Sequence, residues 1–244
     1  MTKHIDEISP LVYARVAGLA YLITIMLGIF SVSYVESSLV ISGDNAATVK
    51  NILENEFLFR IGIACEILMY VLVVLLALAL YVILKTVNKS LALLALLWRL
   101  AEAIVGAGAT VLSGLIPLLL LNSGVAFETQ QLQSLVKLFI DVRNVGLDVV
   151  LIFIGMGGVL FCYLFYTSKY VPRILAVWGM LTYLTMLILS FVSLLTPVPE
   201  TIKMVFYTPG GLFEITFGLW LLIKGINLEQ WKIQTNKPVL KVEI

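Results

Sequence analysis

The sequence contains few residues of the kinds that bind metals, haem or nucleic acid. His4 is its only histidine and precedes the first apolar run, so neither a multi-histidine metal site nor an intramembrane haem is expected. Cys65 and Cys162 both lie inside apolar runs, which favours two packed side chains over a disulfide or a metal site. Only 13% of the residues are charged and the formal net charge is +1, which argues against nucleic acid as a partner.

The short motifs of common enzyme classes are also missing. The chain has no HExxH, GxSxG, CxxC or P-loop motif. The segment SLVK at 134–137 matches SxxK, but it stands on a polar outer segment without any supporting motif. The sequence therefore predicts no catalytic residue, no cofactor and no enzymatic activity.

Hydrophobic sequence is what the chain has in excess. Hydrophobic residues make up 61% of its 244 residues, and the mean hydropathy is +1.05. A helix of about 20 apolar residues crosses the ~30 Å of bilayer hydrocarbon. The sequence predicts an all-α, polytopic membrane bundle with six transmembrane helices, at 11–33, 58–84, 90–120, 143–167, 172–195 and 207–225. A single transmembrane domain over 1–226 and a tail over 227–244 are expected.

The distribution of Lys and Arg between the loops predicts the orientation, because positive loops stay on the cytoplasmic side. The side shared by the two termini holds Lys3, Arg15, Lys85, Lys89, Lys169, Arg173, Lys224, Lys232, Lys237 and Lys241. The opposite, outer side holds Lys50, Arg60, Lys137, Arg143 and Lys203. These are diluted there by seven acidic residues, Glu36, Asp44, Glu54, Glu56, Glu128, Asp141 and Glu200. We therefore expect both termini to lie in the cytoplasm.

Two outer segments have the pattern of short amphipathic helices. Asp44 is a plausible N-cap for a helix whose apolar face includes Val49 and Ile52. A second apolar face is formed by Leu132, Leu135, Val136 and Phe139. Pro172 and Pro209 are expected in the first turns of the fifth and sixth spans, where a missing N–H costs nothing. Both outer helices are predicted to rest on the end of the bundle.

The third span carries two charges within a stripe of small residues. The stripe recurs at steps of three and four, and consists of Ala92, Ala95, Arg99, Glu102, Gly106, Ala109 and Ser113. That spacing places its members on one side of a helix, and small residues allow close helix packing in lipid. A central charge costs about 2.5–3.5 kcal/mol on insertion scales, so the stripe is expected to face protein, with Arg99 and Glu102 partly neutralising each other.

Further charges lie in the other spans. The predicted buried network, a candidate proton or substrate site, comprises Arg60, Glu66, Arg99, Glu102, Arg143, Asp148 and Glu214. Counted from the cytoplasmic ends, an inner tier holds Arg99, Glu102 and Glu214. An outer tier holds Glu66 and Asp148, with Arg60 and Arg143 above. If these four acids and three arginines converge, at least one carboxyl lacks a basic partner, as a proton-coupled carrier needs. Alternatively, the pairs are structural, and Arg60 and Arg143 extend to the headgroups.

Several ordered motifs resemble a bacterial multi-pass membrane family designated domain of unknown function 4386. They include ARVAGLAYL around Arg15 and Gly18, GDNAAT at Asp44 to Thr48, and RLAEA at Arg99 and Glu102. The resemblance covers nearly all of residues 13–226. It implies a helical bundle of the bacterial inner membrane, and it implies no substrate or catalytic residue.

Three functional hypotheses follow, in this order. The first is a structural, interaction or sensor-type component of the bacterial cytoplasmic membrane, in which buried charges determine helix pairing. The second is a small proton-linked carrier that uses the intramembrane carboxylates, and the third is a membrane enzyme that acts on lipid. The expected partners are the lipid bilayer and either other membrane proteins or a small-molecule substrate. A connected cavity lined by the acids would favour the carrier, whereas dry pairing of every acid would favour the structural role.

Overall fold

The computed structural model describes residues 9–122 and 128–236, and the elements in these ranges are all helical. Within them, six helices are long and apolar enough to cross a membrane, as the sequence predicts. These spans are α1 (Pro10–Ile29) with its extensions η1 (Phe30–Glu36) and α2 (Ser37–Leu39); α4 (Glu56–Leu84); α5 (Lys89–Thr110) with its extensions η2 (Val111–Leu115) and α6 (Ile116–Asn122); α7 (Thr129–Ser168); α8 (Arg173–Leu195); and α9 (Glu200–Ile223). Two short helices, α3 (Asn45–Glu54) and α10 (Leu228–Thr235), lie outside the spans.

The outward faces of the spans carry large apolar side chains. Met26, Ile104 and Leu181 are 69%, 65% and 60% exposed, and many similar residues surround the bundle. An apolar surface of this extent is unfavourable in water but suits acyl chains. The chain is therefore a multi-pass membrane protein in contact with the lipid bilayer.

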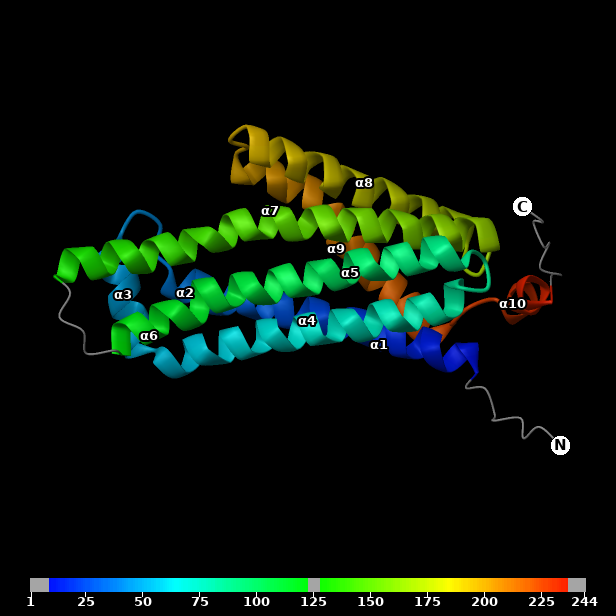
Figure 1. The fold of residues 1–244 in the computed structure, drawn as a ribbon, viewed down its shortest axis with the longest axis horizontal. Coiled ribbons are helices and arrows are strands. Elements are labelled where there is room, and N and C mark those ends of the chain that lie inside the picture. The colour runs from blue at the N-terminus through cyan, green and yellow to red at the C-terminus, as the bar shows by residue number, and fades with distance from the viewer. Residues whose placement is uncertain (1–8, 123–127, 237–244) are drawn as a thin grey trace.

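The six spans form a closed ring in chain order. Each span packs against the next, and α9 packs against α1 to close the ring. The closure is tight at Gly18 on α1, where an added Cβ would lie only 2.5 Å from the carbonyl oxygen of Gly218 on α9. Small residues permit such a backbone approach in lipid. Neighbouring spans are antiparallel, because short turns connect α4 to α5 and α7 to α8 (Figure 1).

The two ends of the bundle differ. We call proximal the end that holds the start of α1, the turns at 85–88 and 169–172, and α10; the distal end holds α3, the loop 40–44 and the start of α7 (Figure 1). Thus the turns that the sequence assigns to the side of the termini do share one end. Part of the predicted tail forms the short helix α10.

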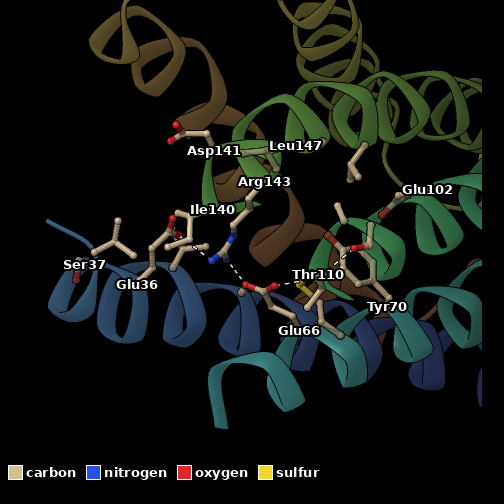
Figure 2. Close-up of a pocket in the computed structure, with 18 of the residues that line it drawn as sticks. Glu36, Ser37, Glu66, Tyr70, Glu102, Thr110, Ile140, Asp141, Arg143 and Leu147 are labelled. Carbon is tan, nitrogen blue, oxygen red and sulfur yellow. Dashed lines mark hydrogen bonds and ion pairs between the residues drawn. The ribbon is translucent and has the colours of Figure 1, made fainter. Parts of the chain in front are cut away.

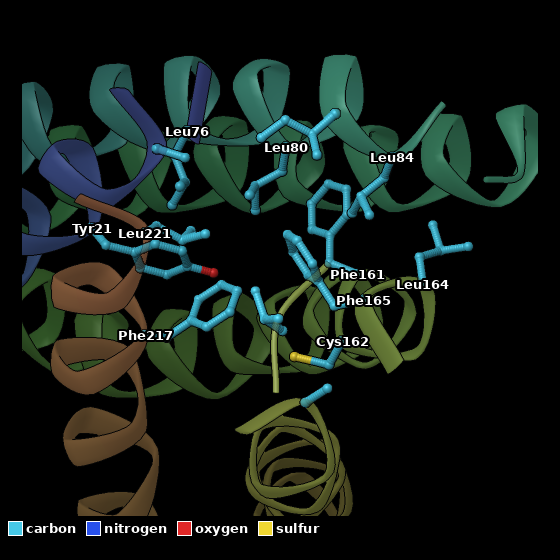
Figure 3. Packing of buried hydrophobic residues seen from close by; sticks show 14 of the residues in the cluster. Tyr21, Leu76, Leu80, Leu84, Phe161, Cys162, Leu164, Phe165, Phe217 and Leu221 are labelled. Carbon is cyan, nitrogen blue, oxygen red and sulfur yellow. The ribbon is translucent and has the colours of Figure 1, made fainter. Parts of the chain in front are cut away.

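The proximal half of the ring is filled with apolar side chains. Its buried core includes Leu76, Leu80, Phe161, Phe165, Phe217 and Leu221, together with Tyr21 (Figure 3). Phe217 packs edge-on against Phe165, with ring centroids 5.2 Å apart, and stacks on Phe213 at 5.3 Å. A smaller cluster at the distal end joins α3 to η1, α4, α6 and α7, and includes Val35, Ile52, Phe59, Leu118 and Val136. This dense packing closes the proximal half of the bundle.

The distal apolar segment around Leu132 differs from its predicted form. It is not a separate short helix but the first part of α7, which runs unbroken for 40 residues. No proline interrupts this stretch, and the predicted apolar face around Val136 is turned inward, where it packs on the distal cluster. At ~1.5 Å per residue α7 is about 60 Å long, so its first turns extend beyond the hydrocarbon. By contrast, α3 is a separate helix as predicted, and Asp44 accepts a 2.8 Å hydrogen bond from the Ala47 N–H.

The start of the sixth span also differs from the prediction. Pro172 precedes α8 as its N-cap, but Pro209 lies inside α9, which begins at Glu200 after Pro199. The prediction was wrong because Pro199 already supplies the start of the helix. The ring of Pro209 leaves the carbonyl of Val205 without its usual helical N–H partner, a defect that transmembrane helices tolerate.

Candidate functional site

A cavity of about 740 Å³ occupies the distal half of the ring. Its walls come from α1 and η1, the loop before α3, α4, α5 and α7, and Glu214 on α9. Figure 2 shows side chains of these elements pointing toward one another across this space. A volume of this size holds a drug-sized molecule. The cavity extends from exposed residues such as Ser42 and Lys137 at the distal end to the buried Arg99 in the interior.

The stripe of small residues on the third span faces protein, as predicted. Ala92, Ala95, Arg99 and Glu102 are buried, and Gly106 lies directly under the ring of Tyr70 on α4. An added Cβ at Gly106 would overlap that ring. The absence of a side chain at Gly106 therefore allows Tyr70 to lie across α5 and to form part of the cavity wall.

The outer part of the cavity contains Arg143 between two carboxylates. Nη1 of Arg143 lies 3.1 Å from Oε2 of Glu36, and its Nη2 pairs with Oε1 of Glu66 (Figure 2). Ser31 donates a 2.6 Å hydrogen bond to Oε1 of Glu66, and Thr110 donates one of 2.9 Å to Oε2. Both oxygens of the buried Glu66 are therefore satisfied, and the cluster joins four segments of the ring.

The inner part of the cavity contains Arg99, Glu102 and Glu214. Nη1 of Arg99 and Oε2 of Glu102 lie 2.9 Å apart as an ion pair, but neither atom makes a hydrogen bond of acceptable geometry within the described residues. The Tyr183 hydroxyl on α8 donates a 2.8 Å hydrogen bond to Oε1 of Glu214. The hydroxyl of Tyr21 on α1 lies 3.3 Å from the Tyr183 hydroxyl. Side chains of α1, α8 and α9 therefore meet near Glu214.

Two residues of the predicted network lie outside the cavity. Arg60 is exposed and pairs with Glu56 on its own helix, 2.6 Å away. Asp148 is buried, but it accepts a 2.7 Å hydrogen bond from Ser193 on α8 and pairs with Lys203 on α9 at 3.2 Å. The seven charges therefore do not converge in one cluster, because Arg60 and Asp148 have partners outside the cavity. Asp148 lies on the face of α7 that packs toward α8 and α9, whereas Arg143 faces the cavity.

Several residues of the site were not predicted from the sequence. Glu36 was counted as an outer loop residue, because the first span was expected to end at 33; in the structure that span continues to Leu39. Ser31, Thr110 and Tyr183 carry no sequence signal as partners of carboxylates, because hydroxyl residues are common in membrane helices. The apolar residues within SVSYVE were the signal that the first span continues past residue 33. A span extended through them would have included Glu36.

Acidic groups outnumber basic groups on the cavity wall. The described lining residues include three bases, Arg99, Lys137 and Arg143, and five acids, Glu36, Glu66, Glu102, Asp141 and Glu214. With every group ionised, the wall would carry a formal charge of −2. In the described ranges, no group of three or more His, Cys, Asp or Glu side chains is arranged to hold a metal ion.

Comparison with known proteins places the chain in a family. The family model described as Domain of unknown function (DUF4386) matches residues 16–225, which include every residue of the cavity wall. No curated protein and no solved structure matches the chain. Because the match covers most of the chain and spans all six membrane helices, this protein belongs to the DUF4386 family.

Proposed function

We propose that this protein is a membrane carrier, which binds a small solute in the distal cavity and exchanges it for protons. The observation that supports the proposal is the cavity of about 740 Å³, whose wall includes Glu66, Glu102 and Glu214. A purely structural network predicts dry packing around these acids, so the cavity favours the carrier hypothesis. The proposal assigns the chain no chemical reaction, and the solute leaves unchanged.

The asymmetry of the bundle also supports transport. The cavity reaches exposed residues at the distal end, whereas the aromatic core around Phe165 and Phe217 fills the proximal half. A carrier that is open to one side has this arrangement: a binding site near the middle of the membrane and a closed half behind it. We propose that the cavity opens toward the proximal end when α9 moves relative to α1. These two helices close the ring.

The surroundings of Glu214 support the proposed exchange for protons. Its hydrogen-bond partner is the neutral hydroxyl of Tyr183, and none of the ion pairs within the described residues includes Glu214. An ionised carboxyl in a membrane interior is costly unless a cation accompanies it. Binding and release of a proton at Glu214 would remove that cost in one state of the transport cycle.

We infer that both termini face the cytoplasm of a bacterial cell membrane, so that the cavity opens outward. The supporting observation is the excess of Lys and Arg at the proximal end, where Lys85, Lys89, Lys169 and Arg173 flank the turns. Loops rich in these residues remain on the cytoplasmic side during insertion.

A thermal-shift screen of the detergent-purified protein tests the proposed function. The panel contains organic cations, organic anions, zwitterions and neutral metabolites of a size that fits the cavity. We expect one class to raise the unfolding temperature, since a ligand that binds only the folded state stabilises it. Ala109→Phe, which places a ring in the cavity, should abolish the effect. Ile104→Phe, at a lipid-exposed position on the same helix, should retain it. Absence of stabilisation by every class would contradict the proposal.

A structural role is a second candidate, and the Glu66 cluster favours it. Arg143, Ser31 and Thr110 together satisfy Glu66 and join α1, α4, α5 and α7. Such a cluster stabilises one arrangement of helices whether or not a solute binds. The two roles are separable, because the inner residues Glu102 and Glu214 are not part of this cluster.

A further inference from the structure

We propose, as an extension of the proposed carrier function, that the cavity binds small organic cations with an apolar body, which displace one proton from the two inner carboxyls, Glu214 and Glu102. The charge of the cavity wall favours a cation. Each basic side chain of the described wall is already paired with an acid: Arg99 with Glu102, Arg143 with Glu36 and Glu66, and Lys137 with Asp141. An anionic ligand would have to break one of these pairs, whereas a cation meets two carboxylates in excess.

The inner carboxyls Glu102 and Glu214 have few basic groups around them. The ionisable groups that interact with Glu214 are Tyr21 on α1, Arg99 and Glu102 on α5, Cys162 on α7 and Tyr183 on α8. Those that interact with Glu102 are Arg99, Glu214 and Tyr70 on α4. One guanidinium therefore serves two inner carboxyls, which leaves room for one more positive charge. Either a proton or a bound cation can supply it, and the two compete.

The remaining wall of the cavity is largely apolar. Apolar side chains line the parts of the wall that the charged residues do not occupy. They include Ile25, Val32, Met69, Val73, Leu147 and Val150. Val32 and Leu147 both line the cavity and are each 50% exposed. The ring of Tyr70 lies on the same wall, and aromatic faces attract cations. A ligand that combines one positive charge with a hydrocarbon or aromatic body matches both parts of the surface.

The exchange balances in charge and in atoms. In the empty state, protons on the carboxyls of the wall offset the excess of two acids. When a monovalent cation binds beside Glu214, one carboxyl O–H bond breaks, the proton leaves to water, and the carboxylate pairs with the cation. No covalent bond to the cation forms. The stoichiometry is therefore about one proton released per monovalent cation, and the affinity for the cation should rise with pH, by up to tenfold per pH unit while the proton competes.

Two ions of nearly the same shape and opposite charge test this inference in purified protein. Tetraphenylphosphonium and tetraphenylborate are titrated by calorimetry, and proton release is measured with an indicator in weak buffer. We expect the phosphonium to bind with release of about one proton, and the borate not to bind. Glu214→Gln should weaken phosphonium binding at least tenfold and remove the proton release, whereas Glu214→Asp should keep part of both. Asp148→Asn, which changes a buried carboxyl outside the cavity, should leave both unchanged.

The outcomes separate this inference from the proposed function. Binding of tetraphenylborate, or binding of the phosphonium without proton release, would overturn the inference. If only a neutral or anionic compound of the thermal-shift panel stabilises the protein, and Ala109→Phe abolishes that effect, the cation inference is wrong and the proposed function stands. If no compound of the panel and neither ion binds the folded protein, both are wrong. Gel filtration of each variant shows whether it is folded.

Discussion

The guanidinium of Arg143 on α7 pairs with the carboxylate of Glu66 on α4, across the interior of the helical ring. These helices are not neighbours in the ring order, since α5 lies between them. The pair therefore crosses the cavity instead of joining two adjacent faces. A salt bridge in this position lies between the distal opening of the cavity and its buried inner tier, and it holds the two sides of the ring at a defined separation.

Removal of Arg143 should destabilise the protein strongly. Arg143→Gln leaves the buried Glu66 with two hydroxyl donors and no counter-charge. Because the side chain of Arg143 is itself 24% exposed, we expect a loss of about 2 kcal/mol, below the ~3–5 kcal/mol of a fully buried pair. The double variant Arg143→Gln/Glu66→Gln should recover part of the lost stability, because it no longer has an unpaired carboxylate. The free energy of unfolding in detergent measures both effects. Arg60→Gln is the control, since the exposed pair of Arg60 with Glu56 contributes about 1 kcal/mol or less. Equal effects of Arg143→Gln and Arg60→Gln would contradict this role of Arg143.

Two glycines two positions apart on α5 should respond in opposite ways to alanine. Gly106→Ala brings a Cβ into the ring of Tyr70, which must move, and overpacking of this kind costs about 1–3 kcal/mol. Gly108 has no atom within 4 Å of an added Cβ, so Gly108→Ala should maintain or raise stability through better helix propensity. Thermal unfolding of the two variants side by side provides the measurement. A similar unfolding temperature for both would show that Tyr70 does not lie where the structure has it.

The crossing of α1 and α9 should be intolerant of any side chain at Gly18. In Gly18→Ala the Cβ would meet the backbone of Gly218 and Leu222, which cannot move away as a flexible side chain can. We expect a loss of about 1–3 kcal/mol in stability. Gly211→Ala is a matched control on α9, because an added Cβ there has open space around it. Retention of wild-type stability by Gly18→Ala would argue against this closure of the ring.

The inner carboxyls should control proton-linked flux. Proteoliposomes that contain a pH-sensitive dye are given benzyltrimethylammonium, a cation that crosses lipid poorly, and the resulting proton movement is followed. Glu102→Gln and Glu214→Gln should each reduce its rate to less than a tenth of wild type, because a glutamine amide cannot bind and release a proton at this site. Asp148→Asn should retain most of the rate. Unchanged flux in both cavity variants, with normal folding, would eliminate the carrier proposal.

Thiol labelling can test the orientation of the protein in intact cells. After Cys65 and Cys162 are replaced by alanine, single cysteines are introduced by Gln131→Cys at the distal end and Lys232→Cys on α10; both positions are exposed. A membrane-impermeant maleimide should label position 131 in intact bacteria and label position 232 only after lysis, because the positive proximal loops stay inside. The reverse pattern would place the termini outside and the cavity opening in the cytoplasm.

Features that depend on a single helix could be predicted from the amino-acid pattern alone. Apolar run length predicted the six spans, periodicity predicted that the stripe with Arg99 and Glu102 faces protein, and Asp44 indicated the start of α3. Each of these is a local property, because hydrophobic length, helical spacing and capping act within a few turns of one segment.

Which charges meet depends on how the helices pack, and the amino-acid pattern did not predict it. Arg143 and Asp148 lie five positions apart on α7, yet one faces the cavity and the other pairs with Lys203 on α9. Glu36 joined the site because the first span is longer than expected, and Arg60 paired within its own helix instead. In lipid, the neighbours of a helix are selected by close packing rather than by hydrophobicity, so a sequence indicates that a charge must be satisfied without indicating which helix supplies its partner.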